Sequence, residues 1–71
     1  MNNLQLFMQE VESRLSLARG ADDRALRNLH TQYADGMIYG AMISGLIDFD
    51  QWDSLHKQIV ACKLAPLGAA A

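Results

Sequence analysis

The segment Ile43-Ser44-Gly45-Leu46-Ile47-Asp48-Phe49-Asp50-Gln51-Trp52 contains a helix end, a short corner and a helix start. Gly45 is expected to end the preceding helix. Asp48 and Gln51 have the spacing of a capping box, in which each side chain bonds to the other residue's backbone amide. Ile47 and Trp52 flank that cap in the positions of a hydrophobic staple. The segment therefore predicts two neighbouring helices joined by a tight corner.

Downstream of the corner, a helix is expected over about residues 48–63, because Pro66 cannot continue it. Its predicted buried face consists of Phe49, Trp52, Leu55, Ile59 and Val60. Residues 65–71 are expected to form a flexible C-terminal tail behind a single helical domain, 1–64.

Upstream of the corner, a helix is expected over about residues 22–44, with Asp22 or Asp23 as its N-cap. One stripe predicts its buried face: Leu26, Leu29, Tyr33, Met37 and Ala41. From Met37 to Ile43 apolar residues surround nearly the whole helix, which is typical of a helix central in a bundle or covered by a partner.

A first helix is expected over about residues 3–19, from a capping box of Asn2 and Gln5 to a left-handed Gly20. Its apolar residues recur at helical spacing: Leu4, Phe7, Met8, Val11, Leu15 and Ala18. The fold class is therefore all-α, with three helices in a small bundle or helical hairpin.

The chain has 71 residues, 51% of them hydrophobic, and one cysteine, which excludes an internal disulfide. Domains this small usually gain stability from disulfides, a metal or a partner subunit. A homodimer is therefore expected, in the reducing cytoplasm that a lone thiol fits.

The net charge of −2 disfavours broad, charge-driven nucleic-acid binding. The N-terminus lacks the basic start of a signal peptide. The longest nearly apolar run, 37–47, is about half the length of a membrane span. Neither export nor membrane insertion is expected.

No catalytic or metal site is expected. Cys62 and His56 point away from each other on one helix, and no third group is evident to orient them. Asp48, Asp50 and Asp53 lack the glycine and distal glutamate of a calcium-binding EF-hand loop, and helix capping explains them. We therefore expect no enzyme activity, no cofactor and no bound metal.

Two groups of apolar residues are candidates for a protein interface. Ile38, Tyr39 and Met42 lie off the main stripe of the second helix, and aromatic and methionine side chains suit partner surfaces. Leu6 and Leu17 share a line on the back of the first helix. The alternatives are that the first group fills the core and that the second is incidentally exposed.

Arg24 and Arg27 share a helix face near Arg14, Arg19 and His30. Two interpretations are open: these residues bind an acidic partner or a phosphate at a protein interface, or they form a solvated face balanced by nearby carboxylates.

Gly36, Gly40 and Ser44 recur every four residues and predict a close helix crossing, either across a dimer axis or within the bundle.

A helix-turn-helix that binds DNA is the alternative function, because a glycine turn precedes the third helix. The residues that would face the bases include Asp48, Asp50 and Asp53, which would repel phosphates, and only Gln51 suits base reading.

The segment Tyr33–Ala41, followed by Gly45-Leu46-Ile47-Asp48 and the helix that contains Trp52, resembles small all-helical proteins of bacteriophages and prophages. Members of that group bind and inhibit host proteins, and anti-activators are among them. The resemblance covers about half of the chain and assigns no residue roles. It implies an inhibitor or modulator of a host protein, for example a transcription regulator.

Overall fold

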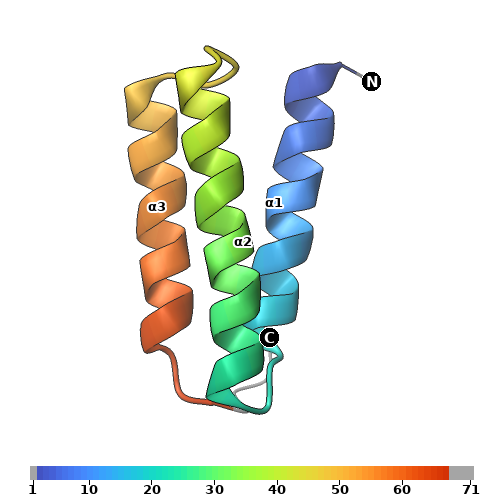
Figure 1. The fold of residues 1–71 in the computed structure, drawn as a ribbon, viewed down its shortest axis with the longest axis vertical. Coiled ribbons are helices and arrows are strands. Elements are labelled where there is room, and N and C mark those ends of the chain that lie inside the picture. The colour runs from blue at the N-terminus through green and yellow to red at the C-terminus, as the bar shows by residue number, and fades with distance from the viewer. Residues whose placement is uncertain (1, 68–71) are drawn as a thin grey trace.

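A computed structural model describes residues 2–67 of the protein, which form three helices (Figure 1). They are α1 (Asn3–Arg19), α2 (Arg24–Ile43) and α3 (Phe49–Leu64). α2 runs antiparallel to both neighbours and makes most of the contacts between helices, whereas α1 and α3 touch each other sparsely. The predicted all-α bundle is confirmed, and no helix end differs from its expected position by more than two residues.

The helix starts match the caps expected from the sequence. Asn2 and Gln5 form a capping box at α1, and Asp48 and Gln51 form one at α3. In the α3 box the Asp48 Oδ1 atom accepts from the Gln51 amide at 2.8 Å, and the Gln51 Oε1 atom accepts from the Asp48 amide at 2.8 Å. Asp23, one of the two expected candidates, caps α2. Local sequence therefore positions all three starts.

The two glycines expected to end helices behave differently. Gly45 has φ +83°, and the bonds Gly45 N–H to Met42 O and Leu46 N–H to Ala41 O complete a Schellman motif at the end of α2. Gly20 has φ −85°, so its predicted left-handed conformation is wrong. The right-handed turn continues there, since the Gly20 and Ala21 amides still bond to Ser16 and Ala18 carbonyls.

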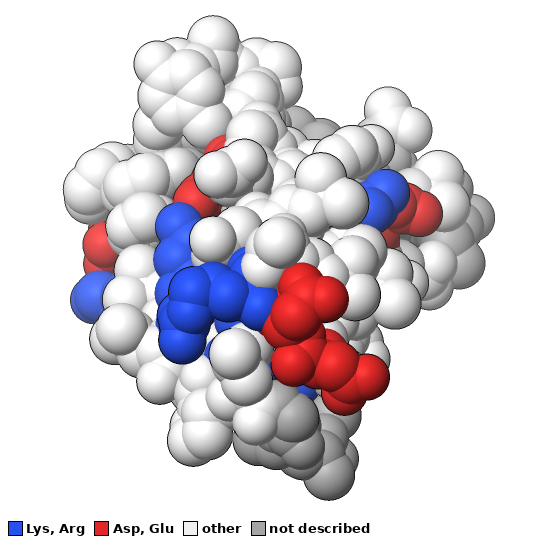
Figure 2. Space-filling model, turned by 60° about the horizontal axis from the view of Figure 1, so that its bottom comes forward, with Lys and Arg blue, Asp and Glu red and all other residues white. Residues whose placement is uncertain are grey.

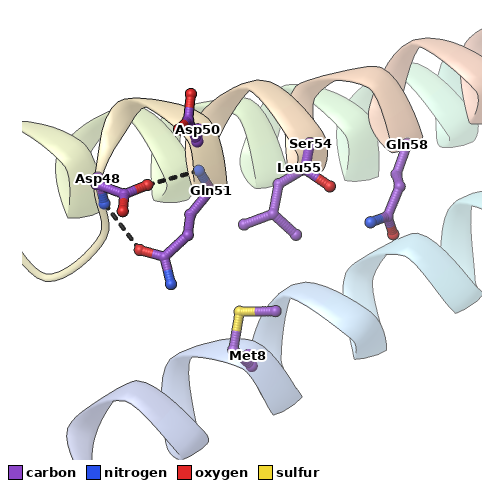
Figure 3. Close-up of a pocket in the computed structure, with 7 residues that line it drawn as sticks. All are labelled: Met8, Asp48, Asp50, Gln51, Ser54, Leu55 and Gln58. Carbon is purple, nitrogen blue, oxygen red and sulfur yellow. Dashed lines mark hydrogen bonds between the residues drawn. The ribbon is translucent and has the colours of Figure 1, made fainter.

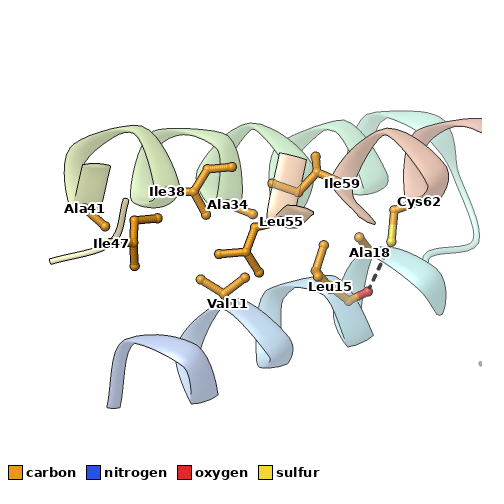
Figure 4. Close-up of a cluster of buried hydrophobic side chains, with 10 residues drawn as sticks. All are labelled: Val11, Leu15, Ala18, Ala34, Ile38, Ala41, Ile47, Leu55, Ile59 and Cys62. Atoms are coloured by element: carbon orange, nitrogen blue, oxygen red, sulfur yellow. Dashed lines mark hydrogen bonds between the residues drawn. The ribbon is translucent and has the colours of Figure 1, made fainter. Parts of the chain in front are cut away.

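The core lies where the three helices meet (Figure 4). Its residues from α1, α3 and the corner are Val11, Leu15, Ala18, Ile47, Leu55, Ile59 and Cys62. Trp52 packs against this cluster together with Leu4 and Phe7. In α1 and α3, three residues predicted to be buried are instead exposed, namely Met8, Phe49 and Val60, because they lie at the edges of their helix faces.

The rotation of α2 about its own axis differs from the prediction. Its buried residues are Arg27, Thr31, Ala34, Ile38 and Ala41. Leu26, Leu29 and Tyr33, predicted to be buried, are exposed. The buried face is therefore displaced by one residue, or about 100° of helix rotation.

Arg27 explains this rotation. Its side chain is 0% exposed, so its predicted place in an interface is wrong. The guanidinium donates to the carbonyls of Ala18 at 3.0 Å, Arg19 at 3.5 Å and Pro66 at 3.2 Å, and also to that of Ala65. These carbonyls lie at the C-terminal ends of α1 and α3, where unpaired acceptors and the helix dipole place negative charge. One cation therefore caps two helices.

The predicted tail begins at Ala65, and the carbonyls of Ala65 and Pro66 accept these bonds from Arg27. The remainder of that prediction, residues 68–71, lies outside the described residues. Among residues 2–67, no helix combines the length and hydrophobicity that crossing a membrane requires.

Candidate protein-protein interface

The outward side of α2 carries a second apolar seam. We call it the α2 outer face and define it by Leu26, Leu29, Tyr33, Gly36, Gly40 and Ile43. These positions alternate spacings of three and four residues, as in the contact seam of paired helices. Leu29 is 60% and Ile43 68% exposed, and both glycines are exposed. α2 thus presents one seam to its own core and another to solvent.

The α2 outer face contains no charged side chain. Between Leu26 and Ile43 the Arg, His and Asp side chains are Arg27, His30 and Asp35, and all three have partners elsewhere. Arg27 is buried, while the Asp35 carboxylate contacts α3. An exposed helix face that stays uncharged for about five turns is unusual for a solvated surface and typical of an interaction site.

The glycines do not mediate packing within the bundle. A Cβ atom at Gly36 or Gly40 would meet nothing within 4 Å, so a close crossing with α1 or α3 is wrong as an explanation for them. Ala34 and Ala41 occupy the inner seam instead. Ser44 is exposed, and its hydroxyl donates to the Ala41 carbonyl at 3.1 Å. A crossing between two molecules remains the prediction for this stripe.

Tyr33 borders α1 and is held in place from that side. The Arg14 guanidinium carbon lies 3.8 Å from the Tyr33 ring centroid, a cation–π geometry. Arg14 Nη1 also lies 3.4 Å from His30 Nδ1. Because Tyr33 remains half-exposed, the contact orients the ring and leaves much of it available to a partner.

The remaining predicted apolar interface residues divide into exposed and covered ones. Leu6 and Leu17 are half-exposed on α1, and Tyr39 is similarly exposed on α2. Met42 is half-buried against the core. Ile38 is fully buried, so its predicted place in an interface is wrong, because the rotation of α2 turns it into the inner seam.

The expected arginine cluster does not form a single basic surface. Figure 2 views the end where α1 finishes and α2 begins, and basic and acidic residues lie side by side there. Arg19 pairs with Glu12 at 3.2 Å, whereas Arg24 is exposed beside Asp22 and Asp23 in the chain. Arg24 and Arg27 therefore do not share an accessible face.

An aromatic and charged cluster between α2 and α3 was not predicted from the sequence. Trp52 stacks on His56 with ring centroids 4.8 Å apart, and Phe49 lies 5.7 Å from Trp52. The His56 Nδ1 and Lys63 Nζ atoms lie 3.5 and 3.1 Å from the Asp35 carboxylate. The i, i+4 spacing of Trp52 and His56 could have indicated the stacking, but nothing local links Asp35 to α3.

A groove between α1 and α3 was also not predicted from the sequence. Its wider part has a volume of about 370 Å³ and lies between Met8 of α1 and the start of α3 (Figure 3). The α3 side is lined by Asp48, Asp50, Gln51, Ser54, Leu55 and Gln58. A second hollow of about 250 Å³ continues past Gln58, lined by Arg19, Ala61, Cys62 and Ala65. The sequence offered no signal for this groove, because its apolar pattern assigned Met8 to the core.

Cys62 and His56, the pair considered for catalysis, lie on different sides of α3. The Cys62 thiol is buried and donates to the Leu15 carbonyl at 3.7 Å, whereas His56 faces α2. Within residues 2–67, no three His, Cys, Asp or Glu side chains are grouped closely enough to hold a metal ion.

Comparisons of the chain with protein-family models, with curated protein sequences and with solved structures found no match.

Proposed function

We propose that the protein is a non-enzymatic binding module that uses the α2 outer face to form a homodimer and to block or modulate a partner protein. The observation that supports this most directly is the uncharged, exposed seam of large apolar residues along α2. The resemblance to small phage proteins suggests a host protein as the partner, for example a transcription regulator.

The apolar side chains of the α2 outer face by themselves support at most a weak interface between two copies. Full burial of a Leu, Ile or aromatic side chain contributes about 1.5–3 kcal/mol, so a half-exposed one gains roughly 1 kcal/mol when a partner covers it. Four such side chains on each of two copies give about 8 kcal/mol, against association costs of about 4–15 kcal/mol. Added contacts from Leu6 and Leu17 would favour a stable complex.

The proposed dimer can be tested by light scattering coupled to gel filtration. The double substitution Leu29→Ser, Ile43→Ser is expected to convert a dimer to a monomer, because it places hydroxyls in the apolar seam. Leu64→Ser is the matched control, since Leu64 is 80% exposed and lies on α3. A wild-type monomer at high micromolar concentration would contradict the homodimer.

The same variants test partner binding in a pull-down from a bacterial lysate. A partner captured by wild type and by Leu64→Ser, but lost with the double variant, would support the α2 outer face. Equal capture by both variants would place the binding surface elsewhere.

DNA binding receives no support from the fold, and we do not propose it. α2 and α3 lie side by side and antiparallel, whereas the two helices of a helix-turn-helix cross at roughly 90–120°. Asp48 and Asp50 are also exposed at the start of α3. A gel shift at low salt would check this conclusion, since genuine DNA binding weakens steeply as salt rises.

A further inference from the structure

We propose that the groove between α1 and α3 binds a basic amphipathic helix of a partner protein. This site lies apart from the α2 outer face and does not depend on the function proposed for that face.

The spacing of the two hollows matches the anchors of a helix. Leu55 lines the wider hollow and Cys62 the narrower one, and Gln58 borders both. Leu55 and Cys62 are seven residues apart, which is about 10 Å along α3. A helix lying beside α3 places its i and i+7 side chains at the same interval, the usual anchor pattern for a helix in a groove.

The walls allow a helix to approach. On the α3 side they include Ser54, Ala61 and Ala65, whose short side chains leave room for a neighbouring backbone. On the α1 side Met8 is 41% exposed, and its flexible thioether adapts to irregular apolar partners. The sparse contact between α1 and α3 keeps this side of the bundle open.

The charge of the groove selects a basic ligand. Asp48 and Asp50 lie on the rim of the wider hollow, and neither carboxylate has an ion-pair partner within residues 2–67. The N-terminus of α3 offsets them with only about half a positive charge. Arg19 lines the narrower hollow and is paired with Glu12 at 3.2 Å. The unbalanced charge is therefore negative, and the ligand's basic residues should lie over Asp48 and Asp50.

The test is a titration of the full chain with labelled synthetic helices of roughly 14 residues, followed by fluorescence anisotropy. One peptide carries Leu at positions i and i+7 and Lys at one end, and the control peptide has Glu in place of Lys. We expect the Lys peptide to bind at least tenfold more tightly, with affinity that falls as salt rises. Equal binding of both peptides, or no binding of the Lys peptide at millimolar concentration, would overturn the proposal.

Variants then locate the site. Asp50→Asn should weaken binding three- to tenfold, while Asp53→Asn, the same change on the side of α3 away from the groove, should alter it less than twofold. Ser54→Trp should weaken binding at least tenfold by filling the wider hollow. Met8→Ala supplies a second test from α1 if the tryptophan variant fails to fold.

Leu29→Ser, Ile43→Ser separates this site from the α2 outer face. That double variant should bind the Lys peptide as wild type does, even if it no longer forms a dimer. Loss of peptide binding in this variant, with Asp50→Asn unaffected, would assign the peptide to α2 and overturn the groove proposal.

Discussion

Arg27 shows how one residue can determine the packing of three helices. Its guanidinium carries a buried charge whose neighbours are carbonyls of two helix ends. Burying an ion is unfavourable unless hydrogen bonds and opposite charge compensate it, and these carbonyls supply both. Thr31, one turn later on the same buried face, donates to the Arg27 carbonyl at 3.0 Å.

Arg27→Ala is expected to lower the free energy of unfolding by about 3 kcal/mol, because it leaves carbonyls at two helix ends unpaired. Urea denaturation followed by far-UV circular dichroism measures this change. Arg24→Ala is the control, since Arg24 is exposed at the start of the same helix, and it should cost less than about 0.5 kcal/mol. Equal effects of the two substitutions would contradict the capping role of Arg27.

At the scale of the element, α2 is a helix with two seams, and both have the spacing expected of a contact face. The inner seam contains an arginine, a threonine, two alanines and a single large apolar residue, Ile38, whereas the outer one contains two leucines, a tyrosine and an isoleucine besides its two glycines. A prediction based on the size of the apolar side chains therefore places the outer seam in the core. Hydrophobic pattern alone cannot predict the rotation of such a helix.

A pair of alanine substitutions tests this rotation. Ile38→Ala should cost about 3–4 kcal/mol of stability, because Ile38 is fully buried and its truncation leaves a cavity. Leu29→Ala should cost less than about 1 kcal/mol, because Leu29 is already exposed. Chemical denaturation at low protein concentration, where self-association contributes least, is the appropriate measurement. A reversed order of the two effects would show that the outer seam is buried.

Two glycines of the same region should respond to alanine with opposite signs. Gly45→Ala is expected to destabilise the fold by about 1–2 kcal/mol, because Gly45 has φ +83° and an L side chain strains that backbone. Gly36→Ala should stabilise it by up to about 1 kcal/mol, since Gly36 lies within a helix with open space around it. Thermal melts of both variants at low protein concentration, where a dimer contact at Gly36 contributes least, provide the comparison, and a shared sign would contradict it.

At the scale of the whole molecule, apolar surface remains on two sides of a small bundle. The α2 outer face lies on one side, and the α1–α3 groove opens on another. The bundle has a single core shared by three helices, and two of them, α1 and α3, barely touch each other. Such a chain gains more stability from binding a partner than a domain with a larger enclosed core does.

If the α2 outer face forms a dimer, stability should depend on protein concentration, because association stabilises only the folded chain. The melting temperature of wild type is expected to rise by several degrees between low and high micromolar concentration. The variant Leu29→Ser, Ile43→Ser should show no such rise, while Leu64→Ser should behave as wild type. A concentration-independent wild-type melt would contradict dimerisation through this face.

Local sequence was enough to predict the helix boundaries and the corner at Gly45, because caps, breakers and turn residues act on backbone groups only a few positions away. The buried faces of α1 and α3 were also predicted correctly at their centres, because each of these helices has a single apolar stripe there and only that face can pack into the core. Which seam of α2 faces inward could be seen only once the three helices were packed together. That choice depends on Arg27 reaching the ends of α1 and α3, in contacts with residues up to 39 positions away in sequence. The exposed apolar face and the groove both follow from how the helices are packed.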